Sequence, residues 1–335
     1  MEEKLLDLIP DLRPNHRKIV QDIFRATIKL AQASPGTLNL KISSTVLKEL
    51  RYSFKMFSPH RHIPKITMFG SARVPSDTPL YAFAKRFAEE AVKRNYMIIT
   101  GGGPGIMAAG NEGASSEHGF GLNIRLPFEQ SANTFIDQKR KLIHYKYFFT
   151  RKLFLVKEAA AFVFMPGGYG TMDEAFEVMT LLQTGKTNLI PVVFLEPKGF
   201  GFWTKMIKFF DEVVLKHGFI SGSDAHLFRV YHTAKEALDH FDKFYSVYHS
   251  MRYVREGVVF RLKRQISDAA VKKANGQFPV LTRLGKIEKT GPHPEESNEP
   301  ELDKLPRLFF PFDKRDFGAL REFIDFINDK RSGIT

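Results

Sequence analysis

The chain of 335 residues contains no cysteine. Disulfide bonds, zinc–thiolate sites and thiol nucleophiles are therefore excluded, and the composition fits a reducing compartment. The sequence also lacks an apolar run of the roughly 20 residues that a membrane-spanning helix requires. Its first residues are acidic where a signal peptide would be basic, and no long apolar region follows them. We expect a cytoplasmic protein that does not associate with a membrane.

Positive charge is in excess, because 50 Lys and Arg accompany 37 Asp and Glu, for a net charge of +13. A solvated basic surface, an anionic small substrate or a nucleic acid would each account for this excess. The basic residues are spread along the chain and form no run of about five to eight, which a nucleic-acid patch would show. The 11 histidines show no metal-ligand spacing such as H-E-x-x-H. We therefore expect neither a metal site nor a nucleic-acid partner.

Three segments with different patterns follow one another along the chain. Residues 1–60 have helical periodicity and suggest an N-terminal cap, with one helix starting at Pro14 and a second over 43–57. Over residues 61–250, short apolar runs alternate with helical patterns, which is typical of a parallel sheet covered on both faces. Residues 251–335 suggest a small α+β appendage. The predicted fold is α/β, a Rossmann-like doubly wound parallel sheet with an N-terminal helical cap and a C-terminal α+β appendage.

The expected elements can be placed by residue number. In the middle segment we expect strands at 66–69, 96–100, 119–126, 161–165, 190–195 and 227–231, and helices at 78–94, 105–117, 149–158, 203–216 and 234–249. In the last segment we expect strands at 256–263, near 280–290 and at 305–312, and helices at 267–276 and 316–329. The acidic, proline-rich stretch 291–304 is interpreted as an exposed loop.

Glycine-rich turns follow three of the expected strands. They are Gly70-Ser71-Ala72-Arg73, Gly101-Gly102-Gly103-Pro104-Gly105 and Pro166-Gly167-Gly168-Tyr169-Gly170-Thr171. Open α/β sheets bind ligands at the carboxyl ends of their strands. The third turn joins a buried strand to an amphipathic helix, so it presents backbone N–H groups and the positive end of a helix dipole to an anion. With Glu174 one helical turn further on, this pattern suggests a site for a phosphorylated sugar.

Several of these residues have a second interpretation. Thr171-x-x-Glu174 is also a capping box, although a capping box requires none of the glycines that precede it. Arg151 and Lys152 begin a helix, where they are either solvated or hold an anion, since cations are slightly unfavourable at a helix N-terminus. Gly185 belongs to a G-K-T sequence that lacks the first glycine of a P-loop, so we expect it to end the preceding helix.

Together these motifs resemble the Lonely Guy (LOG) family. The resemblance covers roughly residues 62–250 and is carried by G-G-G-P-G-I-M at 101–107, Arg151-Lys152, and P-G-G-Y-G-T-M-D-E at 166–174. Members of the family are nucleoside 5′-monophosphate phosphoribohydrolases, the cytokinin-activating enzymes among them, long labelled "possible lysine decarboxylases". No lysine here is accompanied by the partners of a pyridoxal-phosphate site.

The resemblance implies an activity and an assembly. It implies an N-glycosidase (nucleosidase) that hydrolyses the N-glycosidic bond of a nucleoside monophosphate to free base and ribose 5-phosphate, without a cofactor. It also implies a homodimer or larger homo-oligomer. The preferred base and the biological role, whether cytokinin activation, salvage or nucleotide-pool control, are not indicated by the sequence.

The resemblance also implies roles for site residues. Glu174 would be catalytic, stabilising positive charge on the ribose or orienting the attacking water. Arg151 would be the second catalytic residue, assisting the leaving base or clamping the phosphate, with support from Lys152. The remaining expected contacts are with substrate: the 5′-phosphate would be held by Gly167, Gly168, Gly170 and Thr171, and the pocket lined by Gly70, Ser71, Gly102, Gly103 and Gly105.

Two further functions remain open. The first is a nucleotide-binding sensor or carrier on the same fold that performs no hydrolysis, because a fold alone does not determine function. It would bind a nucleotide tightly and release no product. The second is a basic protein associated with nucleic acid, whose binding would weaken steeply with salt.

Overall fold

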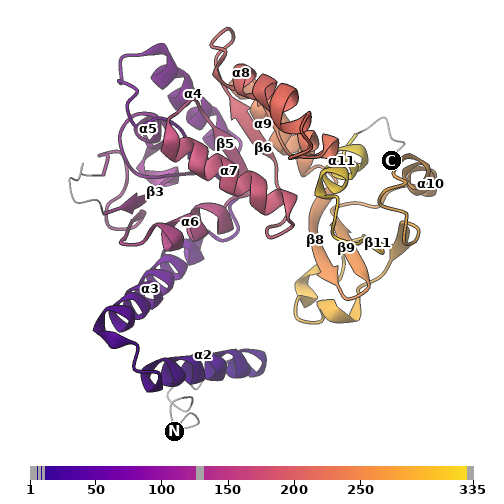
Figure 1. Cartoon of the computed structure of the whole chain (residues 1–335), viewed down its shortest axis with the longest axis horizontal. Coiled ribbons are helices and arrows are strands. Elements are labelled where there is room, and N and C mark those ends of the chain that lie inside the picture. The colour runs from indigo at the N-terminus through magenta and orange to yellow at the C-terminus, as the bar shows by residue number, and fades with distance from the viewer. Residues whose placement is uncertain (1–5, 7–8, 10–11, 126–131, 330–335) are drawn as a thin grey trace. The chain divides into compact units, whose positions relative to one another are not determined.

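The computed structural model describes residues 6, 9, 12–125 and 132–329. The contacts within the chain define two compact units, residues 1–55 and 56–335 (Figure 1). Within the described residues, no helix is both long enough and apolar enough to cross a membrane.

The first unit consists mainly of α2 (Pro14–Gln32) and α3 (Gly36–Phe57), whose last two residues belong to the second unit. Helix α3 begins at Gly36, so the start predicted at residue 43 was wrong. The polar residues in its first turns do not interrupt it. The Asn39 amide donates to the Pro35 carbonyl at 2.7 Å, and the Ser43 hydroxyl donates to the Asn39 carbonyl at 3.0 Å.

The second unit is built on a parallel sheet with the strand order β4-β3-β2-β1-β5-β6-β7. The chain starts at the centre with β1, winds to the β4 edge, returns beside β1 with β5, and then winds to the other edge. This topology confirms the predicted doubly wound α/β fold, and the winding direction reverses between β1 and β5. The strands are β1 (Lys65–Phe69), β2 (Met97–Thr100), β3 (Gly119–Ile124), β4 (Leu142–Tyr145), β5 (Ala161–Phe164), β6 (Val192–Leu195) and β7 (Arg229–Tyr231).

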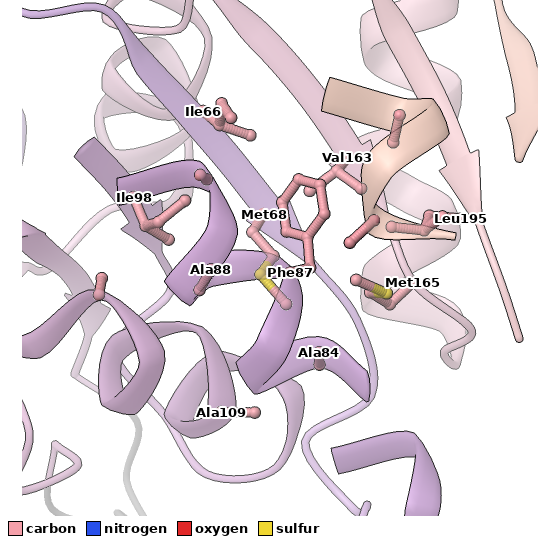
Figure 2. Close-up of a cluster of buried hydrophobic side chains, with 14 of the residues drawn as sticks. Ile66, Met68, Ala84, Phe87, Ala88, Ile98, Ala109, Val163, Met165 and Leu195 are labelled. Atoms are coloured by element: carbon pink, nitrogen blue, oxygen red, sulfur yellow. The ribbon is translucent and has the colours of Figure 1, made fainter. Parts of the chain in front are cut away.

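One face of this sheet is covered by α4 (Pro79–Lys93), α5 (Ile106–His118) and α9 (Ala234–Phe244). Figure 2 shows Phe87 of α4 beside Met68 of β1 and Val163 of β5. Successive strand residues point to opposite faces, so a strand covered on both faces needs apolar residues throughout. Every residue of β1, β2 and β5 is buried accordingly.

The other face is covered by α6 (Phe148–Lys157), α7 (Tyr169–Gln183) and α8 (Phe202–Phe209). The Thr67 hydroxyl of β1 donates to the Leu155 carbonyl of α6 at 2.8 Å. The indole of Trp203 in α8 stacks on Phe194 of β6, with ring centroids 4.5 Å apart. Helix α8 continues only as a π-helical segment over Phe210–Leu215, whereas a single helix to residue 216 had been predicted.

The C-terminal appendage, orange to yellow in Figure 1, is an antiparallel sheet with the order β10-β11-β9-β8 and two helices, which confirms its predicted α+β class. Phe323 of α11 packs edge-on to Phe310 of the sheet, with ring centroids 5.7 Å apart. The elements are β8 (Tyr248–Val254), β9 (Gly257–Leu262), α10 (Asp268–Gln277), β10 (Glu288–Thr290), β11 (Arg307–Phe310) and α11 (Phe317–Ile327).

The stretch 291–304 is largely exposed, as its composition suggested, but it is more ordered than a plain loop. It forms two short 3-10 helices, Pro294–Glu296 and Pro300–Leu302, and Glu296 is only 1% exposed. The Glu296 carboxylate accepts from Arg261 at 2.6 Å and from Arg307 at 2.9 Å. Because two buried guanidinium groups need a counter-charge, this segment folds against the sheet.

Several other elements differ from expectation. Strands β4 and β8 were not predicted, and β10 forms only the end of the strand expected near 280–290. Helix α9 ends at Phe244 rather than 249, because the Asn328 side chain accepts from the backbone N–H groups of Val247 and Tyr248, where β8 starts. Strand β3 ends at Ile124 and does not include Arg125, so the predicted end was too late, and residue 126 lies outside the described residues.

The appendage packs against the C-terminal end of α7. Gly185 follows this helix with a φ of +65°, and the Lys186 N–H donates to the Leu181 carbonyl at 2.9 Å, as in a Schellman motif. The prediction that Gly185 ends the helix is confirmed. A Cβ at this position would lie 2.0 Å from the ring of Phe317, so the appendage approaches the glycine directly.

Candidate functional site

The three glycine turns meet at one end of the sheet. They follow β1, β2 and β5, which are neighbours in the strand order, and they lie where the winding direction reverses. The Ser71 N–H donates to the Pro166 carbonyl at 3.1 Å, and the Ile106 N–H donates to the Ser71 carbonyl at 3.0 Å. The three turns are therefore hydrogen-bonded into one surface at the position where open α/β sheets bind ligands.

Glycine is required where these turns touch. A Cβ at Gly167 would lie 2.1 Å from Thr171 Oγ1 and 2.9 Å from the Ser71 nitrogen. Gly105 has a φ of +65°, and a Cβ there would lie 2.4 Å from the Ser71 carbonyl oxygen. At Gly168 and Gly170, in contrast, none of the described residues places an atom within 4 Å of an added Cβ. The first pair is required for packing, whereas the second pair borders open space.

A cavity of 660 Å³ opens over these turns. Eight residues singled out from the sequence line it: Gly70, Ser71, Arg151, Gly167, Gly168, Gly170, Thr171 and Glu174. Gly101, from the turn expected to line the pocket, also lies on the wall, together with residues that the sequence analysis did not assign to the site, among them Arg73, Phe148, Tyr169 and Phe202. Arg73 is the last residue of the first glycine turn, and this position alone does not indicate a role for its side chain.

Four of the expected residues lie behind the cavity wall rather than on it. Gly102 and Gly103 are held by Asn133, whose backbone N–H donates to the Gly102 carbonyl at 2.9 Å and whose amide donates to the Gly103 carbonyl at 3.0 Å. Gly105 brings its turn against Ser71, and Lys152 contacts Glu174 from behind. These residues shape the site without lining the cavity.

Helix α7 begins two residues before Thr171, so the capping-box interpretation was wrong. Gly168 is the N-cap residue, and no side chain caps it among the described residues. Thr171 is the third residue of the helix and its N–H donates to the Gly168 carbonyl at 3.0 Å, while its side chain packs on Gly167. The first N–H groups of a helix have no intrahelical partner, and here they border the cavity at the positive end of the helix dipole. This end can bind an anion.

Glu174 lies one turn further along α7 and is 5% exposed. Its Oε1 is 3.4 Å from the Lys152 Nζ, whereas its Oε2 is buried and has no hydrogen-bond partner among the described residues. Burial raises the pKa of the Glu174 carboxyl, and the charges of Lys152 and Arg151 oppose that rise. Lys152 is itself fixed by Asp173 at 2.9 Å and by Glu177 at 2.6 Å.

Arg151 reaches the same cavity from α6. Its Nε donates to the Leu122 carbonyl at 2.7 Å, and a Cβ at Gly101 would lie 2.3 Å from its Nη2. Burial lowers the pKa of Arg151, and the Glu174 carboxylate acts in the opposite direction. A half-buried guanidinium and a buried carboxylate thus share one cavity with an open helix N-terminus. In the part of the chain that the structure describes, no group of three or more His, Asp or Glu is placed to hold a metal ion.

The structure is that of a Rossmann-like α/β protein with a cavity at the point where the winding of its sheet reverses. A family model described as "Possible lysine decarboxylase" matches residues 97–241. The cytokinin riboside 5′-monophosphate phosphoribohydrolase LOG1 of Arabidopsis thaliana is 31% identical over 152 residues, which cover 44% of this chain and 68% of that protein. The chain belongs to the LOG family.

One further curated relative and two solved structures are also similar to this chain, the solved structures at lower sequence identity. The probable cytokinin riboside 5′-monophosphate phosphoribohydrolase LOG4 of Oryza sativa subsp. japonica is 28% identical over 178 residues, covering 52% of this chain and 74% of the relative. Among solved structures, the structural genomics target TM1055 is 20% identical with a TM-score of 0.41 and covers 54% of this chain and 99% of its own. The molybdenum cofactor carrier protein of Chlamydomonas reinhardtii is 20% identical with a TM-score of 0.36, covering 53% and 96%.

Proposed function

We propose that this protein is a nucleoside 5′-monophosphate phosphoribohydrolase, which hydrolyses the N-glycosidic bond and releases free base and ribose 5-phosphate. One observation carries the proposal. The buried carboxylate of Glu174 lines the same cavity as the N-terminus of α7, and within the described part of the chain one of its oxygens has no hydrogen-bond partner and no side chain caps that helix end. The names of the LOG relatives, which are phosphoribohydrolases, support this activity.

In this proposal the N-terminus of α7 binds the 5′-phosphate. Gly168 and Gly170 allow the phosphate oxygens to approach the backbone N–H groups, since no atom of the described residues lies within 4 Å of a Cβ added at either position. Glu174 is one helical turn above that end, so a ribose attached to the phosphate extends toward its carboxylate. Binding at the phosphate therefore positions the sugar for reaction.

The chemical step breaks the bond between C1′ and the base nitrogen, and the electron pair leaves with the base. Positive charge develops on the ribose, and the Glu174 carboxylate stabilises it and orients a water molecule toward C1′. The water oxygen bonds to C1′, one of its protons remains in the new hydroxyl, and the other neutralises the departing base. Arg151, which lines the same cavity, donates hydrogen bonds to the leaving base.

The test is an incubation with AMP, GMP, CMP, UMP and isopentenyladenosine monophosphate in ¹⁸O-labelled water, followed by chromatography and mass spectrometry. The proposal predicts free base from at least one nucleotide and a single ¹⁸O atom in ribose 5-phosphate. Base release without the label would indicate transfer to an acceptor other than water. Nucleotide binding with no product would contradict the proposal and favour a carrier or sensor.

A further inference from the structure

Arg73 is a cation on the cavity wall that the proposed reaction does not yet use. It is exposed and stands at the end of the turn that follows β1. Its backbone N–H donates to Ser71 Oγ at 3.1 Å, and the Ser71 N–H donates to the Pro166 carbonyl of the neighbouring turn at 3.1 Å. Through Ser71, the backbone of Arg73 is thus connected by hydrogen bonds to the turn that leads into α7.

The other cations of the site are engaged within the protein. Arg151 donates to the Leu122 carbonyl, and Lys152 lies within 3.4 Å of three carboxylates. For the guanidinium of Arg73, the described residues supply neither an ion pair nor a hydrogen bond. Arg73 is therefore the cation of this cavity wall that is free to meet an anionic ligand.

A phosphate monoester requires such a cation. It carries roughly −1.5 to −2 charges at neutral pH, whereas a helix N-terminus contributes about half a positive charge. The planar guanidinium of arginine matches two phosphate oxygens at once and forms strong, charge-assisted hydrogen bonds. Glu174 adds further negative charge to the cavity, which increases the need for compensation near the phosphate.

We propose that Arg73 binds the 5′-phosphate together with the N-terminus of α7 and sets the preference for nucleotides over nucleosides. The inference rests on the proposed function for the identity of the substrate. It is separate from catalysis, since Arg73 meets the phosphate and not the glycosidic bond. Arg73 is accordingly a specificity residue, whose loss affects binding of the phosphorylated ligand.

The experiment compares wild type with Arg73→Ala, Arg73→Lys and a control, Arg86→Ala, which removes the same charge from an exposed position on α4. Calorimetry with ribose 5-phosphate measures the Kd, and the assay described above measures KM and kcat for AMP and for adenosine. Arg73→Ala should raise the Kd roughly 10- to 100-fold, as expected for the loss of a hydrogen bond to a charged group. The Kd of Arg73→Lys should lie between those of wild type and Arg73→Ala, and the Kd of Arg86→Ala should equal that of wild type.

The kinetic results separate this inference from the proposed function. KM for the nucleotide should rise in Arg73→Ala while kcat changes little, and any reaction with adenosine should be unaffected. A wild type that binds ribose 5-phosphate through Arg73 but releases no base would refute the hydrolase and retain the phosphate site. A Kd for Arg73→Ala within about two-fold of that for Arg86→Ala would overturn the inference, as would a wild type that does not bind ribose 5-phosphate.

Discussion

The Lys152 Nζ lies 3.4 Å from one carboxylate oxygen of Glu174, and the other oxygen of that carboxylate is buried without a hydrogen-bond partner in the described residues. Lys152 is fixed in turn by Asp173 and Glu177. One side of the Glu174 carboxylate is thus anchored, while an incompletely satisfied oxygen remains. A buried polar atom without a partner is costly for stability and is characteristic of functional sites.

The first prediction is that Glu174→Gln stabilises the protein at neutral and higher pH. The folded-state pKa of Glu174 is raised, so the folded protein holds this proton more tightly than the unfolded chain does. The stability that this proton contributes is complete below the unfolded pKa and is lost as the pH rises through the folded pKa. The variant should therefore have the higher Tm at pH 8, with a difference that shrinks toward pH 4.

Differential scanning calorimetry across this pH range measures the effect. Glu177→Gln is the matched control, because Glu177 also pairs with Lys152 but lies at a more exposed position, and its Tm difference from wild type should not grow with pH in this way. A Glu174→Gln protein that is less stable than wild type at pH 8 would contradict the electrostatic description of this site.

The second prediction concerns the pH dependence of activity. If Glu174 acts as a carboxylate, kcat/KM falls on the acid side as this group becomes protonated. The positive charge of Lys152 lowers the pKa of Glu174. Lys152→Met should therefore move the acid limb of the profile to higher pH. Measuring kcat/KM between pH 4 and pH 8 for both proteins tests this, and an unmoved acid limb would show that another group controls it.

The third prediction separates packing from binding in the glycine turn. Gly167→Ala places a Cβ against the Thr171 side chain and the Ser71 nitrogen, and overpacking of this kind costs about 1–3 kcal/mol. We expect a Tm lower by several degrees and a loss of ribose 5-phosphate binding. Gly168→Ala meets no atom within 4 Å and should keep the Tm of wild type. Equal Tm values for the two variants would show that the turns are not packed as described.

The fourth prediction tests how the appendage docks on α7. Gly185→Ala and Gly218→Ala both place a side chain at a positive φ, of +65° and +73°. The side chain at 185 also meets the Phe317 ring, whereas no atom of the residues that the structure describes lies within 4 Å of a Cβ at Gly218. Chemical denaturation should show that Gly185→Ala lowers the free energy of unfolding by about 1–3 kcal/mol more than Gly218→Ala does. Equal losses would indicate that Phe317 does not pack on this glycine.

The sequence was most informative where local pattern alone determines structure. Buried strands such as 161–165 need apolar residues on both faces, and the glycines after them mark backbone that must approach another turn closely. The pattern was less informative where distant residues decide. Strand β8 starts where the side chain of Asn328, some 80 residues away, binds the backbone of Val247 and Tyr248. The capping box failed because two glycines before Thr171 let α7 begin earlier.

In the candidate site, too, local motifs predicted some residues, whereas others depend on parts of the chain that are distant in sequence. The motifs identified Arg151 and Glu174, and the structure places both on one cavity wall, although their roles remain predictions. Lys152 follows Arg151 in sequence but lies behind Glu174, because consecutive helix residues point in different directions. Arg73 could not be recognised from its sequence position alone, since its relevance depends on a turn from another strand. The homo-oligomer likewise remains a prediction.

The most direct test of the central claim is the rate of base release from AMP by wild type and by Glu174→Gln, with AMP binding measured on both by calorimetry. The account predicts base release by wild type, at least a roughly 100-fold lower kcat for the variant, and a Kd for AMP within a few-fold of wild type. Equal rates would reduce Glu174 to a structural residue. AMP bound by wild type without any base released would contradict the assignment as a hydrolase.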